Sequence, residues 1–87
     1  MHTHNYSMSK ITQEQIQTLD DEEQEVFEAM KELAALGKPH LALMKREMKK
    51  RGRSERGVNL IIETLTLLGR VSLGAGDDEG KFTIMEQ

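Results

Sequence analysis

The chain has 87 residues, enough for one small domain, and its 12 basic and 15 acidic residues give a formal net charge of -3. It has no cysteine, which excludes a disulfide framework, a thiolate metal site and a cysteine nucleophile. No run approaches the roughly 18 apolar residues of a membrane span. We therefore expect one domain over 11–87 after a disordered tail over 1–10, in a soluble, cytoplasmic protein without membrane contact.

The tail and the residues after it carry weak signals. The opening MHTH has two histidines, but a loose tail accounts for them, and we predict no metal site and no cofactor. Thr12 to Gln15 has the form of a capping box, because a hydroxyl is followed three residues later by a glutamine. This pattern predicts a short helical turn through Ile16 and Leu19.

The first clearly marked helix begins after Asp20. Asp20 and Glu23 repeat the capping-box spacing, and the neighbouring acids favour a helix N-terminus through the macrodipole. Gly37 marks the end of this helix. Apolar residues follow at helical spacing: Val26, Phe27, Met30, Leu33 and Ala34.

A second helix is predicted from Pro39 to Arg51. Proline is tolerated in the first turn, where its missing amide hydrogen is not needed, and Gly52 breaks the pattern. One side of this helix is apolar, with Leu41, Met44 and Met48. The other side carries four cations: Lys45, Arg46, Lys49 and Lys50.

Basic residues are concentrated around this helix. The stretch Lys45 to Arg56 holds seven basic and two acidic residues, whereas Ile11 to Leu36 holds eight acids and one base. A basic block on an acidic chain is typical of a polyanion partner, because cations that meet phosphates release condensed counterions. The alternative is a solvated face balanced by the acidic helix of the same molecule or of a second copy. Contact with phosphates requires an outward, continuous patch whose cations are not paired with carboxylates of the chain itself.

A third helix follows, with Ser54 as its cap and GVNLIIETLTLLG as its body. At 100° per residue, Leu60 and Leu67 fall nearly opposite the core. Such exposed leucines indicate a partner, either a second copy or the N-terminal turn folded over them. Another set of polar residues shares one side away from the core: Arg56, Asn59, Glu63, Thr66 and Arg70.

The chain ends in a pattern of period two. Val71 and Leu73 are predicted to point inward, GAGDDEG forms a loop, and Phe82 and Ile84 point inward on the returning strand. Three helices followed by a β-hairpin define a mainly helical α+β fold.

Over Asp20 to Met85 the chain resembles the winged helix-turn-helix superfamily. The residues that carry the resemblance are the last-helix stripe and the step into the hairpin: Val58, Ile62, Leu65, Leu68, Gly69, Arg70 and Val71. The resemblance implies that the last helix packs this stripe on the first two helices and turns its other side to the DNA major groove.

Two features depart from the superfamily pattern. The turn after the second helix usually has aliphatic residues beside its glycine, whereas here Arg51 and Arg53 flank Gly52, so we expect an exposed, irregular turn. The wing tip, Asp77 to Glu79, has three acids, which DNA should repel.

The favoured hypothesis is a DNA-binding protein, a small transcriptional regulator that acts as a homodimer on double-stranded DNA and is nucleoid-associated. Six cations are expected to hold phosphates: Lys45, Arg46, Lys49, Lys50, Arg51 and Arg53. A further phosphate is expected near Ser54 at the helix N-terminus, while Arg56 and Asn59 read guanine and adenine. With about six phosphates the salt slope of affinity is near -5, and charge reversal of Arg51 and Arg53 weakens binding to all sequences.

The alternative is a winged-helix adaptor that contacts another protein through Leu60, Leu67 and the acidic wing. An enzyme is not expected. His40 stands alone, and Glu55 and Glu63 have no histidine in range, so no general acid–base or nucleophilic arrangement is indicated.

Overall fold

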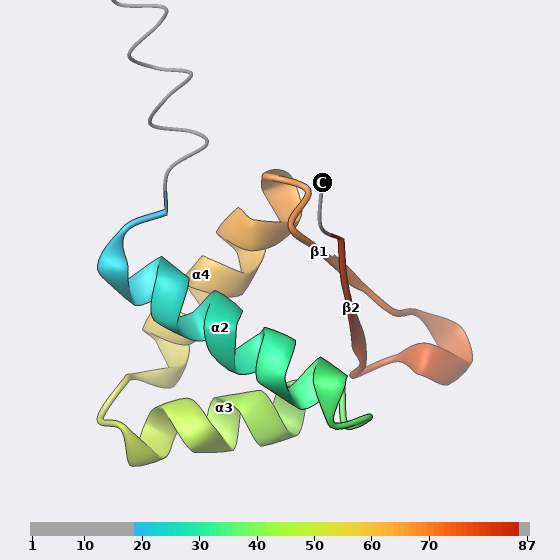
Figure 1. The fold of residues 1–87 in the computed structure, drawn as a ribbon, viewed down its shortest axis with the longest axis horizontal. Helices are drawn as coiled ribbons and strands as arrows, with labels where there is room; N and C mark the ends of the chain where they lie inside the picture. The colour runs from blue at the N-terminus through green and yellow to red at the C-terminus, as the bar shows by residue number, and fades with distance from the viewer. Residues whose placement is uncertain (1–18, 86–87) are drawn as a thin grey trace, which may run out of the picture.

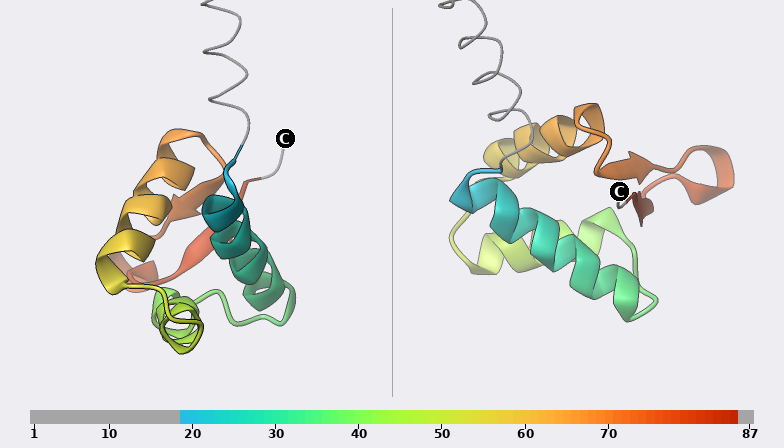
Figure 2. Two further views of the ribbon diagram at one scale, coloured as in Figure 1. Left: turned by 90° about the vertical axis from the view of Figure 1, so that its left-hand side faces the viewer. Right: turned by 45° about the horizontal axis from the view of Figure 1, so that its top comes forward.

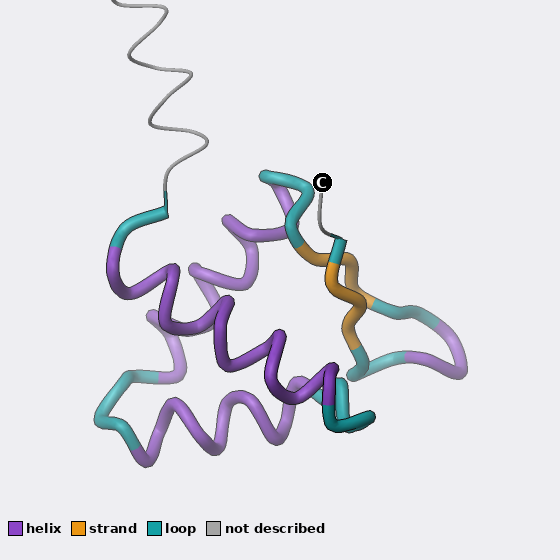
Figure 3. Tube along the Cα trace, in the orientation of Figure 1, coloured by secondary structure: helices purple, strands orange, loops and turns teal. Residues whose placement is uncertain are grey.

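The computed structural model describes residues 19–85. The tail over 1–10, the MHTH stretch, and the capping box of Thr12 to Gln15 with Ile16 lie outside the described residues. The described part contains three helices, α2 (Asp21–Ala35), α3 (Leu41–Lys50) and α4 (Glu55–Leu67). A hairpin of β1 (Val71–Leu73) and β2 (Phe82–Ile84) follows, with the 3₁₀ turn η1 (Gly76–Asp78) at its tip (Figures 1 and 3). The predicted mainly helical α+β class is confirmed.

Helix α2 begins where its sequence predicts. The Asp20 carboxylate accepts from the Glu23 amide at 2.8 Å, and the Glu23 carboxylate accepts from the Asp20 amide at 3.2 Å. This reciprocal capping box satisfies two amides that the first turn leaves without helical partners.

All three helices end in the same way. Gly37, Gly52 and Gly69 have positive φ angles, and in each case the following residue donates its amide back to a carbonyl in the last helical turn. At the end of α3, for example, the Arg53 amide donates to the Met48 carbonyl and the Gly52 amide to Lys49. This is the Schellman arrangement. The turn after α3 is therefore regular, and the expectation of an irregular turn was wrong.

Helix α3 is shorter than predicted. Pro39 is not in its first turn, because Pro39 to Leu41 pairs with the returning strand instead. The Phe82 amide donates to the Pro39 carbonyl at 3.0 Å, and the Leu41 amide donates to the Gly80 carbonyl at 2.8 Å. His40 is extended and forms an antiparallel bridge with Lys81. The residues before α3 thus lie beside β2 as a minimal third strand.

The core lies between the three helices and the inner side of the hairpin (Figure 2). Met30, Met44 and Leu65 bring the three helices together and are fully buried. From the hairpin, Val71 and Phe82 are buried, and Ile84 packs against this cluster. Leu73, which was predicted to point inward, remains 45% exposed.

Leu73 pairs with Phe82, which is buried, but Leu73 itself lies on the border strand of the hairpin and is only partly covered. It lines the edge of a groove with Leu41 and Leu60. Leu68 is only half-buried, and Ile61 is buried in the core. The buried side of α4 is therefore rotated slightly from the predicted stripe.

Candidate nucleic-acid interface

Helix α3 presents its cations to solvent because its opposite side is anchored in the core. Met44 and Met48 are fully buried, which fixes the rotation of the helix. Arg46, Lys49 and Lys50 are exposed, and Lys45 is half-buried at the side nearest α4. Lys49 and Lys50 also lie in the last turn, where positive charge complements the helix macrodipole.

Five cations of the basic block have no carboxylate within 4.0 Å among residues 19–85. We call these residues the cationic face: Lys45, Arg46, Lys49, Lys50 and Arg56. Four come from α3 and one from the first turn of α4. Their charges are therefore available to an external anion.

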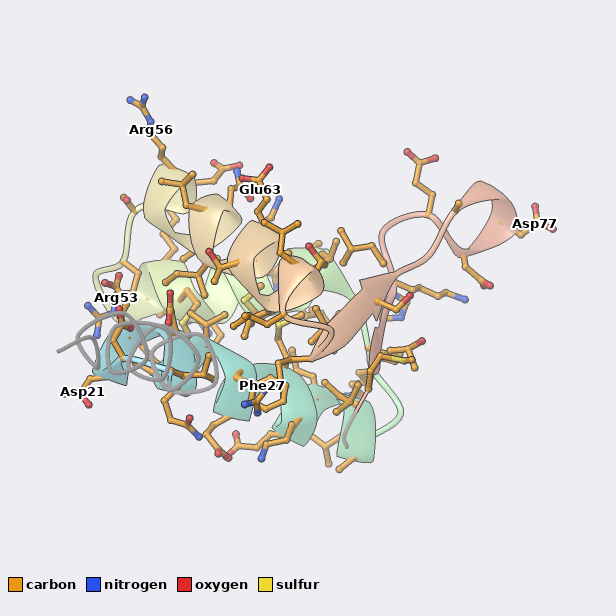
Figure 4. All side chains as sticks on the ribbon, turned by 90° about the horizontal axis from the view of Figure 1, so that it is seen from above. Asp21, Phe27, Arg53, Arg56, Glu63 and Asp77 are labelled. Atoms are coloured by element: carbon orange, nitrogen blue, oxygen red, sulfur yellow. The ribbon has the colours of Figure 1, made fainter. Side chains whose placement is uncertain are left out.

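A groove runs along the outer side of α4. Arg56, Asn59, Glu63 and Thr66, which the helical period predicts on one side, all line it. Lys45 lines the groove from α3 and Leu73 from β1. Figure 4 shows Arg56 and Glu63 projecting from α4 on the side away from α2. The polar side of α4 and the edge of the cationic face thus form one continuous surface.

Arg70 does not join this surface. Its guanidinium carbon lies 5.9 Å from the centre of the Phe27 ring on α2, and the Lys31 ammonium lies 5.0 Å from the same centre. The Schellman turn at Gly69 changes the chain direction after α4, so the helical period no longer predicts the position of Arg70. The expectation that Arg70 extends the outer side of α4 was wrong.

Ser54 caps α4. Its hydroxyl oxygen accepts the Gly57 amide at 3.0 Å, as the sequence predicts. A phosphate was expected at this same helix N-terminus, near Ser54. The Ser54 hydroxyl already satisfies one of the amides there.

Arg51 and Arg53 face α2 and are paired there. Arg53 donates to the Glu25 carboxylate through Nη2 at 2.6 Å and Nε at 3.2 Å, and Arg51 donates to it through Nη1 at 3.1 Å. Glu22 lies 3.6 Å from Arg53, and Glu47 accepts from Arg51 at 3.1 Å. We call these five residues the Glu25 cluster. Figure 4 shows Arg53 beside the N-terminal end of α2.

The Glu25 cluster alters the acidity of its members. Hydrogen bonds from Arg53 first, and from Arg51 second, hold the pKa of Glu25 below its ordinary value, because they stabilise the carboxylate. The same contacts raise the pKa values of both arginines. The condition of a continuous patch of unpaired cations therefore fails at Arg51 and Arg53, which hold α2 against the turn.

The sequence offered the acidic helix as a partner for the basic block, which is confirmed for Arg51 and Arg53, but it did not identify Glu25, which lies 26 and 28 residues away from them. A signal was present: arginines flank Gly52 on both sides, and α2 is rich in acids. Ion pairing with Glu25 on α2 holds both of these arginines.

Two other predicted features are visible at the surface. Leu60 and Leu67 are 58% and 83% exposed. The acids Asp77, Asp78 and Glu79 are also exposed, and Asp77 lies at the opposite end of Figure 4 from Arg56. The negative tip of the hairpin is thus well separated from the start of α4.

Within residues 19–85, no group of three or more His, Asp or Glu side chains is arranged to hold a metal ion. No described helix is both long and apolar enough to cross a membrane. Comparison with protein families, with curated proteins and with solved structures gives no match to this chain.

Proposed function

We propose that this chain is a winged-helix protein that binds double-stranded DNA and regulates transcription or a related DNA transaction. The observation that supports this most strongly is the continuity between the cationic face and the groove on α4. Lys45, one of the four cations of α3, lines the groove together with Arg56 and Asn59, two side chains suited to reading base edges; Glu55 and Glu63 line it as well.

The winged-helix assignment rests on more than the order of elements. The pairing of Pro39 to Leu41 with β2 joins the start of α3 to the hairpin. It gives the hairpin a third, very short strand and fixes its position relative to α3 and α4. In such an arrangement the outer side of α4 is the surface that enters the major groove.

Phosphate contacts are assigned to the four cations of α3: Lys45, Arg46, Lys49 and Lys50. Arg51 and Arg53 are excluded from this set because Glu25 holds both. At about 0.9 counterions per phosphate, four contacts give a slope of log affinity against log salt near -3.6, whereas six would give about -5.4.

Base reading is assigned to the groove. Arg56 suits guanine, Asn59 suits adenine, and Glu63 can accept from a cytosine amino group. The acidic hairpin tip is repelled by phosphates, so we assign it no DNA contact.

The test measures binding to a random duplex by fluorescence anisotropy at several salt concentrations. The variant Arg46→Glu/Lys49→Glu changes two exposed members of the cationic face, and Lys38→Glu/Lys81→Glu makes the same change in net charge elsewhere on the surface. We expect the first variant to lose at least tenfold in affinity and the second to lose much less. Equal losses would refute the assigned surface.

The adaptor function is the second candidate, and the exposure of Leu60 and Leu67 supports it. On that hypothesis the protein does not bind random duplex even at low salt. Substitution of Leu67 by Asp then abolishes capture of the partner protein, while the Arg46→Glu/Lys49→Glu variant still captures it.

A further inference from the structure

Within the described part of the chain, the outer edge of β1 has no strand paired with it. In the hairpin, Ser72 pairs with Thr83, and the flanking bonds run from the Gly74 amide to the Lys81 carbonyl and from the Met85 amide to the Arg70 carbonyl. In an antiparallel ladder the bonded pairs alternate. The backbone groups of Val71 and Leu73 therefore point away from β2, and they form no hydrogen bond with another described residue.

The two edges of this sheet differ in whether another segment pairs with them. Pro39 to Leu41 covers the far edge of β2 through two backbone hydrogen bonds. On the β1 side there is instead a hollow lined by Thr66, Gly69, the strand itself and Met85. Among residues 19–85, β1 is thus the unpaired border of the sheet.

This border is short, at three residues, but it lacks two other devices that keep exposed strands apart. Natural edges carry charged side chains or proline, but the run Val71 to Gly76 has neither, in a chain of which 31% is charged. Leu73 and Met85 beside it are each 45% exposed. An edge that is open, uncharged and apolar is suited to receiving another strand.

We propose that β1 pairs antiparallel with β1 of a second copy of this chain, which forms a continuous sheet across a homodimer. The strand is complementary to itself about Ser72. With Ser72 on a two-fold axis, Val71 lies opposite Leu73 of the second copy, and the reverse pair forms on the other side of the axis. In both pairs the backbone N–H and C=O groups point toward the other copy. Each pair forms two backbone hydrogen bonds, which gives four in total.

The symmetry also places the helices. Because α4 packs on the inner side of the hairpin in each copy, a two-fold axis perpendicular to the sheet puts both α4 helices on the same side of it. A three-residue edge buries far less than the roughly 800 Å² per partner of a standard interface. We therefore expect a reversible dimer that dissociates on dilution.

A single cysteine tests the register directly. The chain has no cysteine of its own, so Ser72→Cys introduces one thiol on the proposed axis. Residues opposite each other in a non-hydrogen-bonded antiparallel pair have Cα atoms about 4.5 Å apart, within the range of a disulfide. The control is Thr83→Cys, an exposed residue on the neighbouring strand. It would lie three strand spacings, about 14 Å, from its copy.

We expect mild oxidation to cross-link Ser72→Cys at least tenfold faster than Thr83→Cys. Sedimentation equilibrium of the unmodified chain should give a weight-average mass that rises with concentration toward twice the monomer mass. Leu73→Lys should abolish that rise, and Thr83→Lys should preserve it. Equal cross-linking of the two cysteine variants, or a monomeric mass at all concentrations, would overturn the proposal. Neither measurement involves DNA, so the outcome is independent of the proposed function.

Discussion

Arg53 donates a hydrogen bond to Glu25 at 2.6 Å, and this contact joins the turn before α4 to the side of α2. Glu25 also accepts from Arg51, so a single carboxylate holds both arginines that flank Gly52. The contact divides the basic block into two groups with different roles. Two arginines stabilise the packing of the turn on α2, and the cationic face remains available to an external anion.

The first prediction concerns this contact. Glu25→Gln should lower the Tm, because it leaves two guanidinium groups without their shared carboxylate. Glu28→Gln is the matched control, since Glu28 also lies on α2 and, among residues 19–85, its carboxylate is bonded to Gln24 and Lys31 at the surface. Thermal unfolding followed by circular dichroism measures both. Equal Tm values for the two variants would show that the Glu25 cluster contributes nothing to stability.

The second prediction is the pH dependence of that difference. The pKa of Glu25 is lowered in the folded protein, so its contribution to stability is present above the ordinary glutamate pKa of about 4.3 and is lost as the pH falls through the folded-state value. The stability gap between the unmodified chain and Glu25→Gln should therefore be constant near neutral pH and shrink below about pH 4. Urea unfolding at several pH values measures this gap. A gap that widens in acid would contradict the assigned sign.

The third prediction separates buried from exposed leucines on α4. Leu65 is fully buried between the helices, so Leu65→Ala should cost about 2–5 kcal/mol of unfolding free energy. Leu67 is 83% exposed, and Leu67→Ala should change stability by no more than about 0.5 kcal/mol. Urea denaturation of both variants checks the rotation of α4 about its axis. Similar losses would mean that this helix is packed differently.

The fourth prediction concerns Gly52, which has φ +86° in the turn after α3. Alanine is strained in this conformation, so Gly52→Ala should destabilise the fold by about 1 kcal/mol or more. Asparagine tolerates positive φ better, and Gly52→Asn should recover part of the loss. If alanine proves as stable as glycine at this position, the turn does not have the Schellman geometry.

Local signals in the sequence predicted most of the fold. Asp20 and Ser54 mark helix starts, Gly37 and Gly52 mark helix ends, and the change from helical to alternating period after Gly69 marks the hairpin. Each signal depends on residues within a few positions of one another, which is the range over which capping and periodicity act.

The features that the sequence did not predict depend on tertiary contacts. Pro39 satisfies the rule for a first helical turn, but its carbonyl accepts a hydrogen bond from the amide of Phe82, far along the chain. The alternating pattern of β1 places Leu73 at an inward position, but the helices leave its side chain 45% exposed. The charges of Arg51 and Arg53 were visible, whereas their partner Glu25 became evident only once α2 was positioned.

The salt dependence of duplex binding tests the central claim most directly. We predict a slope of log affinity against log salt near -3.6 for the unmodified chain, corresponding to four phosphate contacts from α3. Arg51→Gln/Arg53→Gln should keep that slope at a temperature where the variant remains folded, and Arg46→Gln/Lys49→Gln should reduce it to about -1.8. An affinity that does not respond to salt, or a slope that falls with the Arg51→Gln/Arg53→Gln variant but not with the other, would contradict the proposed interface.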